Sequence, residues 1–306
     1  MKVMVFDVGG TEIKYSVMDE GLNRTDAGSV PTPQDTQEHF LDTLYDLYSP
    51  HRDEVSGIAM ALPGFVDTRT GFVSNGGALL YNTGTQVGQL VRERCGCPVT
   101  LENDGKAAAL AELQAGALQG CCNAAVFIIG TGVGGGIIAN GQLVRGVHFT
   151  AGEYSFVNTN AEAWDAPDQN MACQCSTSNL LKWYRARKAL PEDAPLNGRS
   201  FFAAANAGEP EALEVLRRFC HAVAVQIYNL TVLLDVEKVA IGGGISKQPL
   251  LLESLRSAYD GLYASRAGQA YMEGLPRCQI VPCAFSSEAN QVGVAAAYFE
   301  AMQKKC

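Results

Sequence analysis

Two short apolar runs separated by glycine open the chain. Lys2–Asp7 is the first run and stops at Gly9-Gly10-Thr11, and Ile13–Met18 is the second, ended by Asp19-Glu20-Gly21. Apolar runs of this length, bounded by turn-forming residues, predict β-strands. A strand, a tight turn and a second strand predict a β-hairpin at this end of the chain.

A second stretch repeats this arrangement. Ala124–Ile129 is an apolar run, Gly130-Thr131-Gly132 interrupts it, and Gly135–Ala139 resumes it. Asn140-Gly141 follows, and this dipeptide is the strongest short signal for a hairpin turn. The pattern therefore predicts a second pair of strands around a glycine-rich turn.

The two predicted hairpins also resemble each other residue by residue. Val5–Thr11 aligns with Val126–Gly132, and Val17 and Ile138 fall at the same offset. Duplicated strand–turn–strand units predict a duplicated fold of two domains with a cleft between them. The alternative, a chance similarity between two glycine-rich hairpins, stays open on this spacing alone.

The remaining pattern alternates helices with short strands. Apolar residues recur at helical spacing in five segments, which are Thr36–Tyr48, Gln86–Cys95, Lys106–Leu118, Glu209–Leu234 and Gln291–Gln303. Short buried strands are predicted at Gly57–Leu62, Val99–Leu101 and Val239–Ile241. Ala161–Thr177 is polar and irregular, and we expect a loop or flap there. Strands that alternate with helices predict an α/β architecture.

Composition narrows the class of protein. The 306 residues are 47% hydrophobic and 18% charged, which is typical of a globular chain and excludes disorder as the main state. The formal net charge is −9, and no basic stripe of the kind that binds duplex nucleic acid is visible. No apolar stretch reaches the ~20 residues of a membrane helix, and Asp7 interrupts the first apolar run before it has the length of a signal peptide. We therefore expect a cytoplasmic protein without nucleic-acid or membrane partners, whose ten cysteines are reduced thiols.

Glycine-rich turns follow three of the predicted strands. They are Gly9-Gly10, Gly130–Gly136 and Gly242–Gly244. Glycine lets backbone N–H groups approach an anion closely, so such turns bind phosphate, although a tight turn alone would explain any one of them. Three in one chain indicate a nucleotide. None fits the P-loop spacing, and the first two lead into strands rather than into the helix of a dinucleotide-binding unit.

The first glycine turn carries three side chains that suit a nucleoside triphosphate. Asp7 ends the preceding strand, where a carboxylate can hold Mg²⁺ directly or through water. Thr11 can donate its hydroxyl to a phosphate oxygen, and Lys14 can add a positive charge. The plainer interpretations are a turn-forming aspartate and a solvated lysine on a strand.

A strand-to-helix corner carries the candidate for acid–base chemistry. Asn103-Asp104 closes a predicted strand and opens the alanine-rich helix. The helix dipole keeps a carboxylate at this position ionised, which suits a general base that takes a proton from an attacking hydroxyl. Helix capping is the more common role of Asn and Asp at such a place, and both interpretations stay open.

Four polar residues from separate segments are candidates for a pocket. They are Asn75, Asn103, His148 and Glu153. A polyhydroxylated ligand requires several converging hydrogen-bonding groups. The alternative is a set of scattered surface residues.

Several of these segments together resemble the ROK family of bacterial sugar kinases and repressors. The motifs occur in the family's order along nearly the whole chain. They are Asp7-Val8-Gly9-Gly10-Thr11, Leu62-Pro63-Gly64-Phe65-Val66-Asp67, Glu102-Asn103-Asp104-Gly105-Lys106-Ala107-Ala108, the stretch Gly130–Gly136 continuing through Asn140-Gly141, Arg145-Gly146 and Ala151-Gly152-Glu153, and Ile241-Gly242-Gly243-Gly244-Ile245. That ordered set is far more specific than any one of its members.

The resemblance implies an actin-like (ribonuclease H-like) ATPase fold and phosphorylation of a hexose or hexose derivative by ATP, usually on the 6-hydroxyl. It implies that Asp104 is the catalytic base, that Asp7 belongs to the Mg²⁺ site, and that the protein is a homodimer. The expected sugar site comprises Asn75, Gly77, Asn103, Asp104, His148 and Glu153. The expected nucleotide site comprises Asp7, Gly9, Gly10, Thr11, Lys14, Gly130, Thr131, Gly132, Gly243 and Gly244.

The chain departs from the family at its zinc motif. Phe156 stands where many members have a histidine, and the cysteine run keeps only Cys173 and Cys175. Structural zinc takes four N or S ligands, so we expect no zinc here unless a distant Cys or His completes the set. Members without zinc that carry a run like Gly76–Leu79 resemble the branch of β-glucoside and N-acetylmannosamine kinases. His148 is a candidate to replace part of the missing sugar contact.

We expect a smaller N-terminal domain over residues 1–105, completed by a terminal helix over 288–306, and a larger domain over 106–287. A transcriptional regulator of the family would need a DNA-binding module before the first glycine turn. The motif of that turn begins at Asp7, so we expect no such module here. A sugar-binding protein without catalysis is one alternative function, which the presence of Asp7, Thr11 and Asp104 disfavours. An acetamido-sugar kinase of the actin-like superfamily is the other, and substrate screening would separate it.

Overall fold

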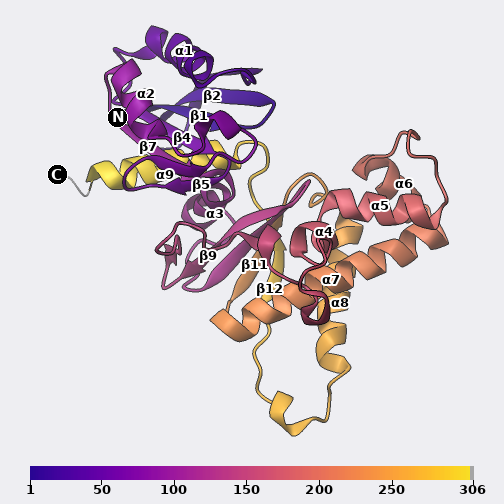
Figure 1. The fold of residues 1–306 in the computed structure, drawn as a ribbon. Helices are drawn as coiled ribbons and strands as arrows, with labels where there is room; N and C mark the ends of the chain where they lie inside the picture. The colour runs from indigo at the N-terminus through magenta and orange to yellow at the C-terminus, as the bar shows by residue number, and fades with distance from the viewer. Residues whose placement is uncertain (304–306) are drawn as a thin grey trace. The chain divides into compact units, whose positions relative to one another are not determined.

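The computed structural model describes residues 1–303, without the side chain of Tyr271. Two compact units make up the chain, and Figure 1 labels most of their helices and strands. Unit 1 comprises Met1–Gly116, Leu143–Ala151 and the segment that begins at Ser287. Unit 2 comprises Ala117–Gln142 and Gly152–Ser286.

Unit 1 is built on a five-stranded sheet with the order β3-β2-β1-β4-β7. The strands are β1 (Lys2–Val8), β2 (Glu12–Asp19), β3 (Arg24–Pro31), β4 (Ile58–Leu62) and β7 (Val99–Asn103). β1, β2 and β3 form antiparallel pairs, whereas β1, β4 and β7 run parallel. Parallel strands are buried on both faces, which explains why β1 and β4 are nearly unbroken apolar runs.

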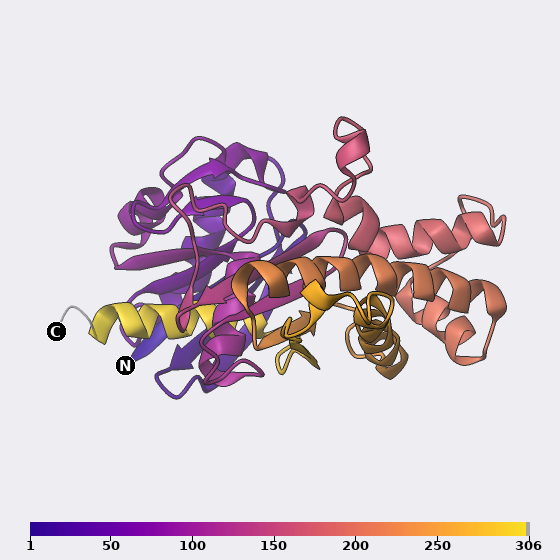
Figure 2. The same ribbon diagram turned by 90° about the horizontal axis from the view of Figure 1, so that it is seen from below.

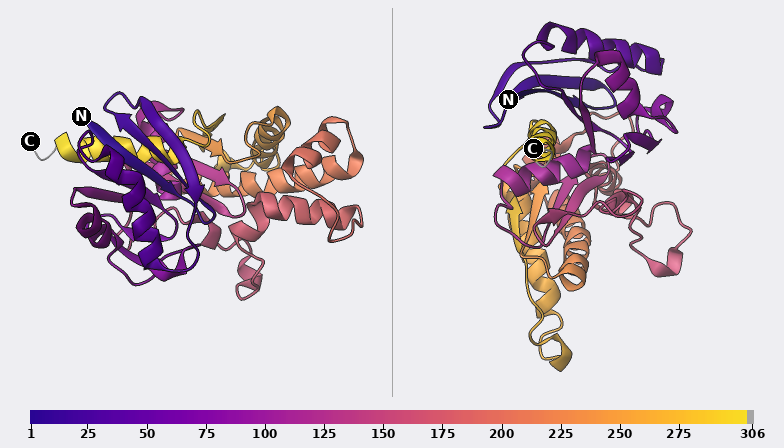
Figure 3. Two further views of the ribbon diagram at one scale, coloured as in Figure 1. Left: turned by 90° about the horizontal axis from the view of Figure 1, so that it is seen from above. Right: turned by 90° about the vertical axis from the view of Figure 1, so that its left-hand side faces the viewer.

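Helices cover both faces of this sheet (Figures 1 and 3). They are α1 (Gln37–Tyr48) and α2 (Val87–Cys95) on one face, and α3 (Asp104–Ala115) and α9 (Ala289–Gln303) on the other. Phe40 and Leu44 of α1 share a core with Phe6 of β1. A Cβ on Gly293 of α9 would lie 1.8 Å from the Ala107 carbonyl oxygen of α3. Only glycine therefore allows the two helices to cross this closely.

Two further strands follow β4 in unit 1. β5 (Phe65–Asp67) and β6 (Phe72–Asn75) form an antiparallel ribbon. The ribbon matters for function because its last residue, Asn75, is one of the candidate sugar contacts.

Unit 2 repeats the sheet of unit 1 in the order β10-β9-β8-β11-β12. The strands are β8 (Ala124–Ile129), β9 (Val133–Ala139), β10 (Gln142–Leu143), β11 (Lys238–Gly242) and β12 (Gln279–Pro282). β8 and β9 are antiparallel, and β8, β11 and β12 run parallel. Each strand thus has a counterpart at the same place in the sheet of unit 1. This confirms the prediction of a duplicated fold.

A helical layer packs on one side of the second sheet (Figure 2). It comprises α4 (Met171–Cys175), α5 (Thr177–Arg187), α6 (Gly198–Asn206), α7 (Pro210–Leu234) and α8 (Pro249–Ala264). The long helix α7 packs against the other four. Phe127, Phe219 and Ile241 belong to the core that joins this layer to the strands. Among residues 1–303, no helix combines the length and the apolar content needed to cross a membrane.

The structure differs from the sequence-based prediction in several elements. β3 was not predicted, because its side chains are mostly exposed and its sequence therefore contains no apolar run. α5, α6 and α8 lie in stretches for which no helix was predicted. The expected loop over Ala161–Thr177 is wrong over Met171–Cys175, which forms α4 and buries Met171 and Cys175 in the core.

The compact units also differ from the expected boundary at residue 105. α3 remains in unit 1 up to Gly116 because it packs along α9. Leu143–Ala151 also belongs to unit 1. Of the expected terminal segment 288–306, residues 289–303 form α9, and residues 304–306 lie outside the described residues.

Candidate active site

The first glycine turn joins β1 to β2 in unit 1 and is fixed by its own carbonyl groups. The Gly9 carbonyl accepts the Thr32 hydroxyl (2.7 Å), and the Gly10 carbonyl accepts Gln34 Nε2 (2.6 Å). The Thr11 carbonyl accepts the Thr32 N–H (3.0 Å). All three carbonyls point to the segment after β3, so the shape of the turn is set by residues outside it.

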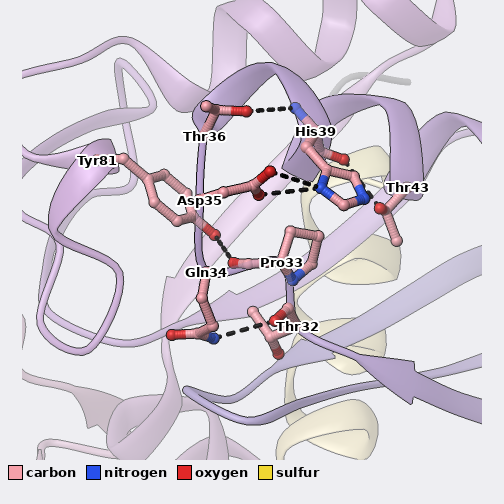
Figure 4. A network of polar contacts seen from close by, with 8 residues as sticks. All are labelled: Thr32, Pro33, Gln34, Asp35, Thr36, His39, Thr43 and Tyr81. Atoms are coloured by element: carbon pink, nitrogen blue, oxygen red, sulfur yellow. Dashed lines mark hydrogen bonds and ion pairs between the residues drawn. The ribbon is translucent and has the colours of Figure 1, made fainter.

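That bracing segment is itself held in place, as Figure 4 shows. Tyr81 donates its hydroxyl to the Pro33 carbonyl (2.9 Å), and Thr36 caps α1 by accepting the His39 N–H (3.2 Å). Gln34 Nε2 also donates to the Thr32 carbonyl (3.0 Å). Thr32 and Gln34 could not be identified from the sequence, because nothing local distinguishes them from other polar loop residues.

Asp7 lies at the end of β1, one residue before the turn begins. Its side chain is only 9% exposed, and Oδ1 accepts a hydrogen bond from Asn290 Nδ2 of α9 (2.8 Å). Lys14 lies directly opposite Asp7 in the β1–β2 pair, so their side chains share one face. Burial raises the pKa of Asp7, and the Asn290 hydrogen bond and the Lys14 charge oppose that shift. The structure therefore brings Asp7 and Lys14 together as expected and adds Asn290, which the sequence analysis missed.

Asn103 takes the capping role that the sequence left open between Asn103 and Asp104. Asn103 caps α3, because its Oδ1 accepts the Lys106 N–H (3.0 Å). Its Nδ2 group donates to the Gly64 carbonyl (2.9 Å) and to Asp104 Oδ1 (3.1 Å). Asp104 Oδ1 also accepts the Gly105 N–H (2.7 Å). Capping thus belongs to Asn103, and the Asp104 carboxylate is oriented by two donors at the positive end of a helix.

A loop of unit 1 brings the sugar candidates Asn75 and Gly77 to this corner. Gly64 has φ +91°, and a Cβ there would lie 2.0 Å from the Asn75 carbonyl oxygen. Asn75 Oδ1 accepts the Gly77 N–H (2.8 Å). A Cβ on Gly10 would lie 2.8 Å from the Ala78 Cβ, so the first glycine turn touches the same loop. The close backbone approaches at Gly10 and Gly64 therefore gather the turn, the loop and the Asp104 corner in one region.

A buried ion pair ties the segment Leu143–Ala151 to the same corner. Glu102, only 3% exposed, precedes Asn103 and accepts Arg145 Nε on its Oε2 (2.8 Å). Burial raises the pKa of Glu102 against the lowering effect of Arg145. His148 is exposed on this segment, and Phe149 beside it is buried under the Arg69 guanidinium at 5.1 Å. In the sequence, Arg145 is visible only as part of the Arg145-Gly146 motif, and its pairing with Glu102 was not predicted.

Unit 2 holds the other two glycine turns side by side. The Gly130 N–H donates to the Gly132 carbonyl (3.0 Å), and the Gly130 carbonyl accepts the Thr177 N–H at the start of α5 (2.9 Å). Gly243, after β11, has φ +95°, and a Cβ there would lie 2.1 Å from the Ile129 carbonyl oxygen. At Gly244 a Cβ would meet nothing within 4 Å. The contact between the turns depends on Gly243 and not on its neighbour.

Glu153 belongs to unit 2, whereas the other sugar candidates belong to unit 1. It precedes the 3₁₀ turn Tyr154–Phe156, and Tyr154 anchors that turn by donating its hydroxyl to the Gly136 carbonyl (3.0 Å).

The positions of the family's zinc motif also lie in unit 2. Phe156, at the position of the family's histidine, is 70% exposed. Cys175 is a core side chain, and burial raises the pKa of its thiol to about 12, whereas Cys173 is partly exposed.

Known proteins resemble this chain over nearly its whole length. The model of the ROK family matches residues 3–303. The β-glucoside kinase of Listeria innocua serovar 6a is 30% identical over 256 residues, which cover 84% of this chain and 87% of the relative. The N-acetyl-D-glucosamine kinase of Vibrio atlanticus is 30% identical and covers 82% of this chain and 86% of its own. A ROK family protein of Streptococcus pneumoniae, solved in complex with sucrose, superimposes with a TM-score of 0.87 at 29% identity and covers 99% of this chain and 100% of its own. The chain therefore belongs to the ROK family, has its actin-like ATPase fold and is an ATP-dependent sugar kinase.

Proposed function

We propose that the chain transfers the γ-phosphoryl group of ATP to the 6-hydroxyl of a hexose or hexose derivative, with Asp104 as the general base. The observation that carries this proposal is the fixed carboxylate of Asp104 at the start of α3. Asn103 Nδ2 and the Gly105 N–H both hold its Oδ1. A base that is oriented before the substrate arrives loses no freedom at the moment of proton transfer.

In the proposed reaction, Asp104 takes the proton of the sugar hydroxyl as that oxygen attacks the γ-phosphorus. A new O–P bond forms, and the bond from the γ-phosphorus to the β–γ bridging oxygen breaks. ADP leaves with that electron pair. Positioning and electrostatic stabilisation supply most of the catalysis in such transfers. Asn103 acts here through Asp104 and α3, while its remaining Oδ1 lone pair is available to a sugar hydroxyl.

The three glycine turns are the proposed contacts of the nucleotide. In unit 1 these are Gly9, Gly10 and Thr11, with Lys14 adding positive charge. In unit 2 they are Gly130, Thr131 and Gly132 with Gly243 and Gly244. Backbone N–H groups in such turns stabilise phosphate oxygens without the cost of reorienting side chains.

Asp7 is the residue that would hold a magnesium ion, directly or through water. A carboxylate oxygen is the ligand type that Mg²⁺ prefers, and the nearly buried Asp7 is held beside the first glycine turn by Asn290. When bound, the ion would neutralise charge on the phosphates.

The proposed sugar contacts are Asn75, Gly77, Asn103, His148 and Glu153. The relatives named above are kinases of a β-glucoside and of N-acetylglucosamine, so both classes belong in a substrate test.

A coupled ADP-release assay with Mg-ATP tests the proposal. The panel contains glucose, mannose, fructose, N-acetylglucosamine, N-acetylmannosamine and cellobiose. We expect turnover with at least one sugar, and a product whose phosphorus couples to the protons on carbon 6 in NMR spectra. Phosphorylation at another carbon would refute the 6-hydroxyl assignment, and silence across the panel with folded, nucleotide-binding protein would show that the substrate is a sugar outside this panel.

A further inference from the structure

A polar hollow of about 340 Å³ lies in unit 2 between α5, α7 and the segment that leads into α4. Its walls include Thr131, Asp168, Gln169, Cys173, Gln174, Ser178, Asn179, Lys182, Trp183 and Arg218. Apart from Thr131, none of these residues belongs to the sites assigned above. We propose that this hollow binds a small phosphate ester, separately from the sugar and the nucleotide.

A residue with a buried, unpartnered amide group belongs to the wall of the hollow. Asn179 is 9% exposed, and its Nδ2 group is buried without a hydrogen-bond partner among the described residues. A buried amide donor without a partner costs about 1–3 kcal/mol, so such groups are rare unless a ligand or water completes them. Asn179 lies in the first turn of α5, from which it lines the hollow.

The start of α5 adds one backbone donor to this amide. Ser176 caps the helix by accepting the Asn179 N–H on its hydroxyl (3.2 Å), and the Thr177 N–H donates to the Gly130 carbonyl (2.9 Å). Of the first three N–H groups of α5, the Ser178 N–H is therefore left for a ligand, at the positive end of the helix dipole. Ser178 adds a hydroxyl to the same wall. Phosphate is the ligand that such an arrangement stabilises most directly.

Two cations without ion-pair partners face the same space. In the part of the chain that the structure describes, neither Lys182 nor Arg218 has a carboxylate within salt-bridge distance. The Arg218 guanidinium stacks over the Trp183 ring at 3.8 Å, which fixes its place. The acidic residue of the hollow, Asp168, accepts Gln169 Nε2 (3.0 Å). The positive charges of Lys182 and Arg218 outnumber the single negative charge of Asp168, so the hollow favours an anion. The volume of the hollow exceeds that of phosphate, which leaves room for an organic group beside Trp183.

Thr131 gives this site a connection to the nucleotide. It lies in the second glycine turn and also lines the hollow. A ligand in the hollow can change the affinity of the protein for ATP. Because coupling between two sites is reciprocal, ATP would then change the affinity for the ligand by the same finite factor. The proposal does not depend on the role of Asp104.

Trp183 provides the readout. The chain has two tryptophans, so a Trp164→Phe background leaves Trp183 as the only indole. Titration with inorganic phosphate and with glycerol phosphate, at ionic strength matched by KCl, should change its fluorescence in a saturable way. Glycerol phosphate should bind more tightly, because inorganic phosphate leaves the organic part of the hollow empty.

Variants of the hollow test the assignment. Lys182→Gln and Asn179→Leu should each weaken binding about tenfold, since each removes a donor to a charged ligand. Arg187→Gln is the matched control, because Arg187 lies on the same helix and pairs with Glu214 at 2.9 Å outside this hollow. It should leave the midpoint unchanged.

Three results would overturn the proposal. One is the absence of a saturable change with either probe, and another is an equal loss of affinity in Lys182→Gln and Arg187→Gln. The third is a midpoint of the glycerol phosphate titration that keeps rising in proportion to the added ADP. That result would mean that the two ligands compete for the nucleotide site. A shift that levels off as ADP saturates would support a separate, coupled site.

Discussion

The hairpin of unit 1 and the hairpin of unit 2 share a place in the fold but differ in chemistry. β1–β2 and β8–β9 occupy equivalent positions in sheets of the same strand order. In the aligned sequences Ile128 stands where unit 1 has Asp7, and Gly134 lies opposite Ile128 where Lys14 lies opposite Asp7. The first hairpin therefore carries a carboxylate and a cation beside its turn, whereas the second offers backbone groups and the Thr131 hydroxyl. The two turns proposed to bind phosphate therefore differ in that Asp7 and Lys14 have no charged counterparts at the equivalent positions of unit 2.

The turns differ in length as well. Four residues, Gly9–Glu12, separate the paired Val8 and Ile13, whereas three, Gly130–Gly132, separate Ile129 and Val133. The sequence similarity of the hairpins therefore holds through the first strand and the turn. Beyond the turn it needs a shift of one residue, so the matching offset of Val17 and Ile138 does not describe equivalent pairs.

If charge chemistry belongs to unit 1, Asp7→Asn should have the largest effect among the variants that compare the two units. We expect kcat/KM to fall by about 10²–10³-fold, because the variant loses the carboxylate proposed to hold the metal. ADP release measured over a range of Mg²⁺ concentrations checks this. Asp46→Asn, an exposed aspartate on α1, is the control and should behave as the parent protein. An Asp7→Asn enzyme with unchanged Mg²⁺ dependence would contradict the assignment.

If backbone geometry defines the turns of unit 2, Gly243→Ala should destabilise the fold while Gly244→Ala should not. Gly243 has a left-handed φ and a clash at 2.1 Å, whereas Gly244 has open space. We expect a loss of about 2–4 kcal/mol for Gly243→Ala in the free energy of unfolding, from strain and displaced backbone. Urea denaturation of both variants measures the difference. Equal stability of the two would remove the argument for a required close approach.

The pair Glu102–Arg145 provides a pH test within unit 1. Arg145→Met should cost about 1–3 kcal/mol at pH 7, because it leaves a buried carboxylate without its partner. The pKa of Glu102 is already raised by burial and should rise further in the variant. When the pKa of Glu102 is higher in the folded state than in the unfolded state, the folded protein loses stability as the pH rises from the unfolded pKa to the folded pKa. The deficit of Arg145→Met against the parent should therefore grow from pH 4.5 to pH 7.

Arg187→Met is the control for that measurement. Arg187 and Glu214 form a pair in which both side chains are half exposed, so its loss should cost less than about 1 kcal/mol at either pH. A pH-independent deficit in Arg145→Met would show that lost packing, rather than the buried charge, explains its effect.

The smallest expected effect concerns the brace of the first turn. Gln34→Ala removes the hydrogen bond to the Gly10 carbonyl, which is worth about 1 kcal/mol. We expect the KM for ATP to rise by about threefold to tenfold, with kcat nearly unchanged. Gln89→Ala, on the exposed face of α2, is the matched control. A fall in kcat without a change in KM would place Gln34 in a different role.

The sequence predicted what local pattern determines. Both hairpins are confirmed, because apolar runs and glycine turns are local signals. The roles of Asp7 and Asp104 remain predictions, but their positions at the ends of β1 and β7 follow from the same signals. Asn290 and Gln34 could not be found in this way. Each acts through a contact that only the folded chain creates, as between Asn290 and Asp7, which lie 283 residues apart.

The most direct test of the central claim compares turnover with nucleotide binding in Asp104→Asn. The change keeps the size of the side chain and removes its basicity. We expect kcat to fall by about 10²–10⁴-fold, while the Kd for ADP, measured by calorimetry, stays within about twofold of the parent value. Loss of turnover with intact binding would support Asp104 as the base. Near-normal turnover in Asp104→Asn, on folded protein with the sugar found in the panel, would contradict it.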